Sequence, residues 1–387
     1  MNSTGKIRLL GLIAASSILA TLPTSAGAAT YVGQIIATGL DNPRGLAFGP
    51  DGTLYVAESG TFNPGGPVAT GGEGPAAYGN SGAITSINNG VQTRVITGLP
   101  SLTSTASGSA SGPQDVAFYN GTGYFLVGLG ANPAVRGNEL GADPGALGLA
   151  SLYSFSGSAY TKVADLGSYE YSFDPDGGVP DSNPYHLVVG PEGLLVTDAG
   201  GNSLLNVTAA GAISTVATFP PANGAQAVPT GVSVGPDGAF YVGQLTGFPF
   251  VPGAADIFRI DPVTGTQTVF ATGFTNITDI AWGGDGSLYV LQYADNGILS
   301  GSAGSIQKLN ADGSHQLLYG GLDTPTGLEI GTDGAFYVST FSPVPGAGQV
   351  MRIAEVVPEP ATWAMLILGF GLVGGAMRRR PAAVVQA

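Results

Sequence analysis

The sequence predicts an all-β fold, a six-bladed β-propeller, from two observations. One phrase recurs six times: an apolar alternation, a Gly-Pro-Asp-Gly-like turn and a Tyr-Val strand, as in GLAFGPDGTLYV and VSVGPDGAFYV. The last three copies are evenly spaced, with turn residues Asp237, Asp285 and Asp333 repeating every 48 residues. That period suits a four-stranded blade better than a helical or leucine-rich repeat.

Each copy expands into four strands. The inner strand alternates apolar residues, as at Leu46/Phe48 and Ile280/Trp282, which places one apolar face against a neighbouring blade. Asp-Gly or Glu-Gly pairs then close a tight hairpin into the second strand. A third strand follows a loop, as in DIFRI, and a fourth ends in small residues, as in VFATGF.

The sixth copy lacks its own fourth strand, because after Ile353 the chain runs into AEVVPEP. The segment IIATGL at 35–40 matches the fourth strands of other copies. We therefore expect the N-terminal strand to complete the last blade and close the ring. Such pairing removes exposed strand edges that would template aggregation. One domain then occupies residues 30–356.

Residues 1–29 have the layout of a secretory signal peptide. Lys6 and Arg8 precede the apolar run LLGLIAASSILA and a small-residue segment, SAGAA. The alternative, a short membrane anchor, is disfavoured because the run is short and rich in Ala and Ser. Both a signal peptide and an anchor would place the ring outside the cytoplasm. A signal peptide implies export through the Sec machinery. The chain has no cysteine, so the exported domain relies on packing and ring closure.

Residues 357–387 form a second targeting segment. Pro358, Glu359 and Pro360 precede an apolar stretch at 361–377 and the cluster Arg378, Arg379, Arg380. The stretch is barely long enough to span hydrocarbon, and the arginines would stay cytoplasmic. The sequence thus predicts a membrane-spanning segment at 361–377 that holds the ring on the outer side of the inner membrane. Anchoring without processing is the alternative.

This tail resembles the PEP-CTERM sorting signal of Gram-negative bacteria. The resemblance implies processing by an exosortase at Pro358, Glu359 and Pro360, and passage toward the cell envelope or extracellular matrix, with only transient anchoring in the inner membrane. It implies nothing about activity. The formal net charge of −14, with five of the twelve basic residues in the termini, makes nucleic-acid partners unexpected.

The ring resembles the ScyD/ScyE family, on the segments VGLGANPAVRG, DPDGGVPDSNPY, VPTGVSVGPDGAFYVGQLTGFPF and FTNITDIAWGGDGSLYVL. The resemblance covers nearly the whole ring and implies a six-bladed exported propeller of poorly defined activity. Two departures stand out: the family tends to have His where this chain has Gln114, and Gly where it has His186. Any role of a family histidine therefore does not transfer directly.

A ligand is expected at one mouth of the central channel, where loops enter the inner strands and leave the second strands. Polar residues gather at those positions, and we predict a ligand-binding mouth made of Arg44, Glu58, Asp115, His186, Asp198, Asn202, Gln244, Asp279 and Gln292. Structural roles compete with this interpretation. Asp115 and Asp279 can accept backbone N–H groups, and Arg44 can pair with Glu58.

No catalytic residues are assigned. The main hypothesis is a non-catalytic exported propeller that binds an envelope polysaccharide or a small molecule and requires no cofactor. The alternative is a metal-dependent lactonase or esterase of the gluconolactonase type, with Glu58, Asp115, Asp279 and Asn202 as the nearest cation ligands. A lyase would need a general base, for which His186 is the only imidazole at the mouth.

A dense acidic segment, FDPDGGVPDSNP, offers a second candidate site. Asp174, Asp176 and Asp181 bring hard oxygen ligands that suit Ca²⁺ or another divalent cation. The EF-hand spacing is absent, and a solvated, Pro-stiffened loop is the competing interpretation.

Overall fold

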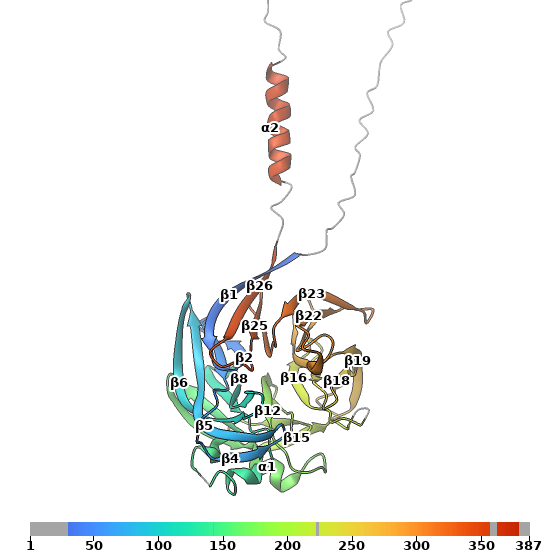
Figure 1. The fold of residues 1–387 in the computed structure, drawn as a ribbon. Helices are drawn as coiled ribbons and strands as arrows, with labels where there is room; N and C mark the ends of the chain where they lie inside the picture. Colours follow the sequence, from blue (N-terminus) through green and yellow to red (C-terminus); the bar gives the residue numbers. More distant parts are fainter. Residues whose placement is uncertain (1–29, 142, 222–223, 357–361, 379–387) are drawn as a thin grey trace, which may run out of the picture.

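Six antiparallel sheets arranged around a common axis make up the protein (Figure 1). The computed structural model describes residues 30–141, 143–221, 224–356 and 362–378. The predicted signal peptide at 1–29 and the predicted processing site at Pro358, Glu359 and Pro360 lie outside these residues. The all-β propeller predicted from the repeats is confirmed.

The first three blades run in chain order, with the first enlarged by extra strands. Blade 1 comprises β2 (Pro43–Phe48), β3 (Leu54–Glu58), β4 (Val68–Gly71), β5 (Gly74–Asn88), β6 (Val91–Ser104) and β7 (Ala110–Ser111). Blade 2 comprises β8 (Pro113–Tyr119), β9 (Thr122–Val127), β10 (Ser151–Ser156) and β11 (Ala159–Asp165). Blade 3 comprises β12 (Pro184–Gly190), β13 (Gly193–Asp198), β14 (Ser203–Val207) and β15 (Ile213–Thr218).

The last three blades have four strands each, and the sixth draws on both ends of the domain. Blade 4 comprises β16 (Pro229–Val234), β17 (Phe240–Gln244), β18 (Ala255–Ile260) and β19 (Gln267–Phe274). Blade 5 comprises β20 (Ile277–Trp282), β21 (Leu288–Gln292), β22 (Gly304–Leu309) and β23 (His315–Leu322). Blade 6 comprises β24 (Gly327–Ile330), β25 (Phe336–Thr340), β26 (Gly348–Val356) and β1 (Thr30–Leu40).

The N-terminal strand pairs with the last strand, as the sequence predicted. β1 runs antiparallel to β26, with Ile35 opposite Met351 and Leu40 opposite Gly348. Ala37 and Leu40 of β1 pack with Val56 of blade 1 in one buried apolar cluster. Side chains also connect the two blades, because the Thr326 hydroxyl donates to the Pro43 carbonyl at 2.9 Å. Blade 6 therefore packs directly against blade 1.

The recurring turn phrase has a clear structural basis. In each of blades 4, 5 and 6 the turn aspartate accepts the backbone N–H two residues later and the tyrosine hydroxyl four residues later, and it pairs with a cation on the third strand. The sets are Asp237 with Ala239, Tyr241 and Arg259; Asp285 with Ser287, Tyr289 and Lys308; and Asp333 with Ala335, Tyr337 and Arg352. Gly238 has a φ of +79°, which favours glycine in this turn.

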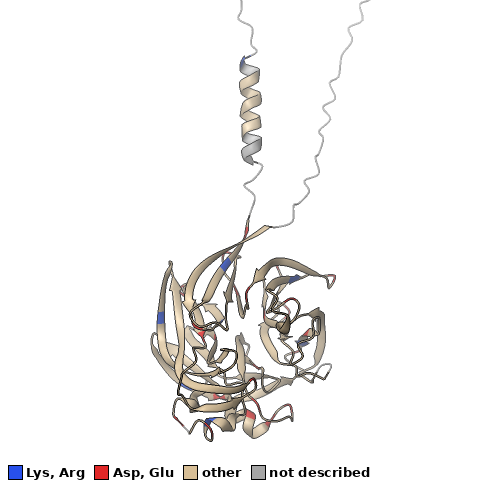
Figure 2. Ribbon diagram, viewed as in Figure 1, with Lys and Arg blue, Asp and Glu red and all other residues tan. Residues whose placement is uncertain are grey.

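Short helices occupy the connections and the tail. They are η1 (Pro133–Arg136), η2 (Ala146–Gly148), α1 (Leu166–Phe173), η3 (Ile298–Ser300) and α2 (Thr362–Arg378). The predicted spanning segment 361–377 thus largely coincides with α2, which extends away from the ring (Figure 1). Within the described residues, however, no helix is both long and apolar enough for a membrane crossing, so the predicted transmembrane segment is not supported. Figure 2 shows that lysine, arginine, aspartate and glutamate positions are scattered thinly along the blades.

Candidate functional site

Three ionisable side chains face one another across the axis of the propeller. Each occupies the same position on its inner strand, just before the first residue of the apolar alternation. That position holds Gly45, Asp115, His186, Gly231, Asp279 and Gly327 in blades 1 to 6. The glycines at this position leave space for the neighbouring aspartates. A Cβ on Gly45 would lie 1.9 Å from Asp115 Oδ1, and one on Gly231 would lie 2.7 Å from the Cα of Asp279.

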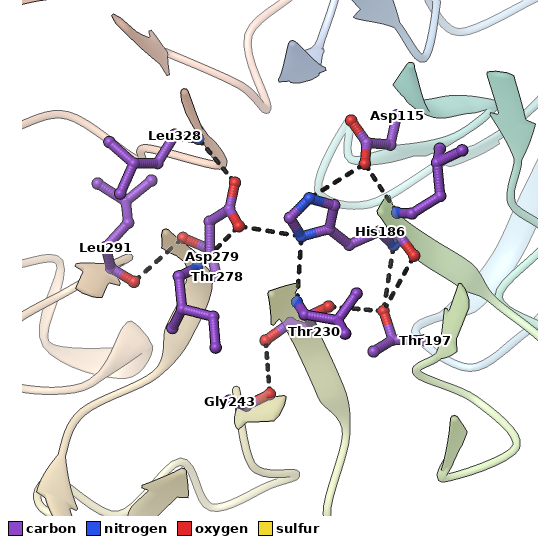
Figure 3. Close-up of polar contacts among 12 residues, drawn as sticks. Asp115, His186, Thr197, Thr230, Gly243, Thr278, Asp279, Leu291 and Leu328 are labelled. Carbon is purple, nitrogen blue, oxygen red and sulfur yellow. Dashed lines mark hydrogen bonds and ion pairs between the residues drawn. The ribbon is translucent and has the colours of Figure 1, made fainter. Parts of the chain in front are cut away.

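His186 lies between the two aspartates (Figure 3). Its Nε2 is 3.2 Å from Asp115 Oδ2, and its Nδ1 is 2.9 Å from Asp279 Oδ1. The side chains of Asp115 and Asp279 are only 3% and 4% exposed, so the contacts are shielded from water. One imidazole thus connects blades 2, 3 and 5.

Backbone N–H groups complete the coordination of both carboxylates. Asp115 accepts from Val116 of its own strand and from Leu187 of blade 3, each at 2.8 Å. Asp279 accepts from Ile280 and from Leu328 of blade 6, each at 2.7 Å. Each aspartate therefore accepts backbone N–H groups, as its structural interpretation requires, and connects its blade to the next.

The charge state of His186 follows from this geometry. Burial lowers its pKa, but Asp279 and Asp115 outweigh burial and raise the pKa to about 9. Burial also raises the pKa of Asp115 to about 7, against the opposing effect of His186. Glu329 lies close by, and burial together with the charges of Asp279 and Asp115 raises its pKa to about 8. The raised pKa of His186 favours the imidazolium at neutral pH. Its Nδ1 also lies 3.3 Å from the Val232 N–H, so the protein engages both ring nitrogens.

Glu58 lies in a separate ion pair within blade 1. Its carboxylate accepts from Arg94 at 2.6 Å, from the Asp41 backbone N–H at 2.7 Å and from the Thr85 hydroxyl. Arg94 also pairs with Asp41 at 2.8 Å. The expected pairing of Glu58 with Arg44 is therefore wrong.

The other polar residues at the ends of the second strands bind their own loops. Asp198 accepts the Ser182 hydroxyl at 2.7 Å and three backbone N–H groups, and Gln292 accepts the Thr275 N–H at 2.7 Å. Asn202 donates to Asp176 at 2.9 Å and accepts from Val228 at 3.0 Å. Gln244 accepts from Asp256, while its amide nitrogen is buried without a partner. Strand pairing places Asp198, Gln244 and Gln292 opposite the first residues of their inner strands, at the predicted end of the channel.

Arg44 is the cation at this end of the channel. One of its terminal nitrogens donates to the Ala110 carbonyl at 2.8 Å, whereas its Nε is buried without a partner. It lies near enough to Tyr185 and Tyr293 for its charge to oppose the rise in their pKa values, which burial causes. Sequence reasoning missed both tyrosines, although Tyr185 immediately precedes His186, as Arg44 precedes Gly45. The Oε1 of buried Gln114, in the same strand position, also lacks a partner.

The acidic segment after α1 forms a second polar cluster. Carboxylate oxygens of Glu170, Asp174 and Asp176 lie within 4.8 Å of one another. The sequence did not predict Glu170 as part of this cluster. Its side chain is 1% exposed. Burial is the largest cause that raises its pKa, to about 8, and the charges of Asp198, Asp176 and Asp174 add to the rise. Asp181, which was predicted, lies outside this group. Burial raises the pKa of Asp181 to about 6, and its side chain lines a cavity of about 280 Å³ together with Asp176.

Comparisons with known proteins support the sorting signal and the fold. Residues 356–380 match the PEP-CTERM protein-sorting motif, which indicates an exported envelope protein of Gram-negative bacteria that is processed by an exosortase. No protein of curated function matches the chain.

Similar solved structures include a glucose dehydrogenase, 14% identical over 84% of this chain and 99% of that one, with a TM-score of 0.51. A structural-genomics target with a provisional gluconolactonase assignment is 12% identical over 85% of this chain and 93% of that one, also with a TM-score of 0.51. At such identities the likeness shows the propeller fold alone. The ScyD/ScyE resemblance is not confirmed by these comparisons and stays a prediction.

Proposed function

We propose that this protein is an exported, exosortase-sorted propeller that binds a saccharide of the envelope or a small molecule at the channel mouth without turning it over. The observation that carries this proposal is the completed network of Asp115, His186 and Asp279. Each aspartate already accepts two backbone N–H groups and a contact from the imidazole. These groups have little capacity left for a reacting substrate.

The residues proposed to contact the ligand are those at the mouth whose polar atoms are not engaged. Arg44, Gln114 and Gln244 each have one such buried atom, and Tyr185 and Tyr293 lie beside Arg44. A guanidinium flanked by aromatic rings suits a carboxylated or hydroxyl-rich ligand, since the charge binds oxygen and the rings cover apolar faces. This role requires no cofactor.

The alternative hydrolase is less well supported by this geometry. A lactonase of the gluconolactonase type would hold a divalent cation at the mouth, but Glu58 is neutralised by Arg94, and Asn202 contacts Asp176 instead of the channel. Asp115 and Asp279 lie on opposite sides of His186. Among the described residues, the four suggested ligands do not converge on one point.

The test is a binding screen of the full chain against purified uronic-acid and neutral polysaccharides, beside a lactone-hydrolysis assay with and without EDTA. We expect saturable binding without hydrolysis. Arg44→Ala should weaken that binding about tenfold or more, whereas Arg259→Ala, which removes an exposed arginine paired with Asp237, should leave it unchanged. EDTA-sensitive lactone hydrolysis, or binding unaffected by Arg44→Ala, would refute the proposal.

A further inference from the structure

The turn that follows α1 brings three carboxylates together away from the channel. Asp165 caps the start of α1 by accepting the Ser168 N–H at 2.8 Å. The helix ends at Asp174, which adopts a left-handed conformation with φ +42° and donates its N–H to the Glu170 carbonyl at 2.8 Å. This reversal carries Asp174 and Asp176 back beside the Glu170 side chain, which belongs to the last turn of the helix.

Glu170 is the member of this cluster whose carboxylate the fold leaves without hydrogen-bond partners. It is 1% exposed, and neither of its carboxylate oxygens has a hydrogen-bond partner. Gly201 allows this close approach, because a Cβ there would lie 2.5 Å from Glu170 Oε2. A carboxylate buried without partners is costly, since burial disfavours its charge and nothing returns the lost hydration.

No cation of the protein offsets this charge. Within the described part of the chain, no lysine, arginine or histidine forms a salt bridge with Glu170, Asp174 or Asp176. The nearby guanidinium of Arg136 is engaged by Asp165 at 2.9 Å and by the Leu149 carbonyl at 2.8 Å.

The other two carboxylates are held in place but keep free oxygen atoms. The Gly178 N–H donates to Asp174 Oδ1 at 3.1 Å and to Asp176 Oδ1 at 2.9 Å, and Asn202 donates to Asp176 Oδ2 at 2.9 Å. Asp174 Oδ2 and both oxygens of Glu170 remain for a ligand. Neighbouring N–H groups thus orient the carboxylates of Asp174 and Asp176, and no cation of the described residues pairs with them.

We infer that Glu170, Asp174 and Asp176 bind a calcium ion. Three carboxylates supply hard, anionic oxygens, and Ca²⁺ accepts six to eight of them in irregular geometry, with water completing the shell. Mg²⁺ fits less well because it demands a near-ideal octahedron and dehydrates reluctantly. The site differs from the sequence prediction, since Glu170 takes the place of Asp181.

Bound calcium would join three connections of the propeller. Glu170 and Asp174 belong to α1 and its end, between blades 2 and 3, and Asn202 links Asp176 to the turn between β13 and β14. Asn202 also accepts the Val228 N–H at 3.0 Å, just before blade 4. The ion therefore stabilises the segment that lines the cavity beside Asp176 and Asp181, independently of any ligand at the channel mouth.

Calcium titration of the EDTA-treated, dialysed full chain tests this inference, by calorimetry and by terbium luminescence excited through Tyr169 and Tyr171, which flank Glu170. We expect one calcium per chain and a rise in the melting temperature of about 2–4 °C at saturation. Glu170→Gln and Asp176→Asn should each weaken calcium binding about tenfold or more. Asp312→Asn, at an exposed turn, is the matched control and should leave it unchanged.

The melting temperatures of the calcium-free proteins show whether a variant that binds no calcium is still folded. Without calcium, Glu170→Gln replaces a buried carboxyl group that has no hydrogen-bond partner by a neutral amide of the same shape, so its melting temperature should equal or exceed that of the wild type, which shows that the variant folds. Absence of calcium uptake at millimolar concentration would overturn the inference. So would uptake that Asp312→Asn weakens as much as Glu170→Gln, because that result indicates unspecific binding to an acidic surface.

Discussion

Asp279→Asn is the substitution that most directly probes the network in the channel. Asparagine keeps the shape but replaces one carboxylate oxygen by an NH₂ group, which cannot accept a hydrogen bond. Asp279 accepts from Ile280 and Leu328, each at 2.7 Å, so one of these N–H groups loses its acceptor. His186 loses one of its two anionic partners at the same time.

The two losses set the magnitude. A buried N–H group without an acceptor costs about 1–3 kcal/mol, and breaking a buried ion pair from one side costs about 3–5 kcal/mol. Because His186 retains Asp115, we take about 4 kcal/mol as the total loss in the free energy of unfolding. With an unfolding entropy of about 2.1 cal/mol/K per residue over 30–356, the melting temperature should fall by about 6 °C.

Thermal unfolding followed by circular dichroism measures this change. The control is Glu192→Gln, which removes a carboxylate at an exposed position; it should cost less than about 1 kcal/mol, or about 1 °C. In a double-mutant cycle, Asp279→Asn and His186→Gln should be non-additive by about 1 kcal/mol or more. A melting temperature for Asp279→Asn within about 1 °C of the wild type would refute the argument that this network ties the blades together.

Three further outcomes are expected. Because the pKa of His186 is raised from 6.5 to about 9, its stabilisation is complete below pH 6.5 and is lost as the pH rises through 9. The raised pKa values of Asp115 and Glu329 lower stability over part of the same range, so the His186 contribution is the difference between wild type and His186→Gln. In calcium-free denaturant titrations this difference should shrink by about 3 kcal/mol, and a difference that is flat over this range would contradict the assigned charge. Gly45→Ala should cost about 2–4 kcal/mol because its Cβ would meet Asp115 Oδ1, whereas Gly284→Ala, which meets no atom within 4 Å, should be nearly neutral in the same measurement; equal effects would count against the packing argument. Deleting residues 30–40 should leave β26 as an open edge and drive the chain into aggregates on size-exclusion chromatography, and a monomer of unchanged melting temperature would argue against the latch.

The fold was predictable because the repeat phrase encodes local chemistry. Asp237 accepts the N–H of Ala239 and the hydroxyl of Tyr241, so the Asp-Gly turn and the Tyr four residues after the aspartate belong to one hydrogen-bonded unit. The same unit recurs in blades 5 and 6, and the missing fourth strand then identified β1 as the partner of β26.

The candidate site was predictable only in position. The end of each second strand was located correctly, but the direction of its side chain depends on neighbours that no local pattern specifies. Glu58 contacts Thr85 and Arg94 on the third and fourth strands of its own blade, where the sequence analysis expected Arg44. Glu170 was missed for a related reason: it lies in a helix between blades, outside the repeat, and only the tertiary fold places it beside Asp174.

The two clusters of ionisable groups differ in how completely the protein satisfies them, and this difference separates scaffold from binding site. In the channel, every carboxylate oxygen of Asp115 and Asp279 has a donor, and His186 supplies the compensating charge. Beside α1, the buried oxygens of Glu170 have no donor and no cation. Since a folded chain tolerates an uncompensated buried charge only at a cost, the unsatisfied cluster is where an external ion gains the most binding energy. We therefore expect an external cation to bind at the acidic segment beside α1, whereas the network around His186 stabilises the ring.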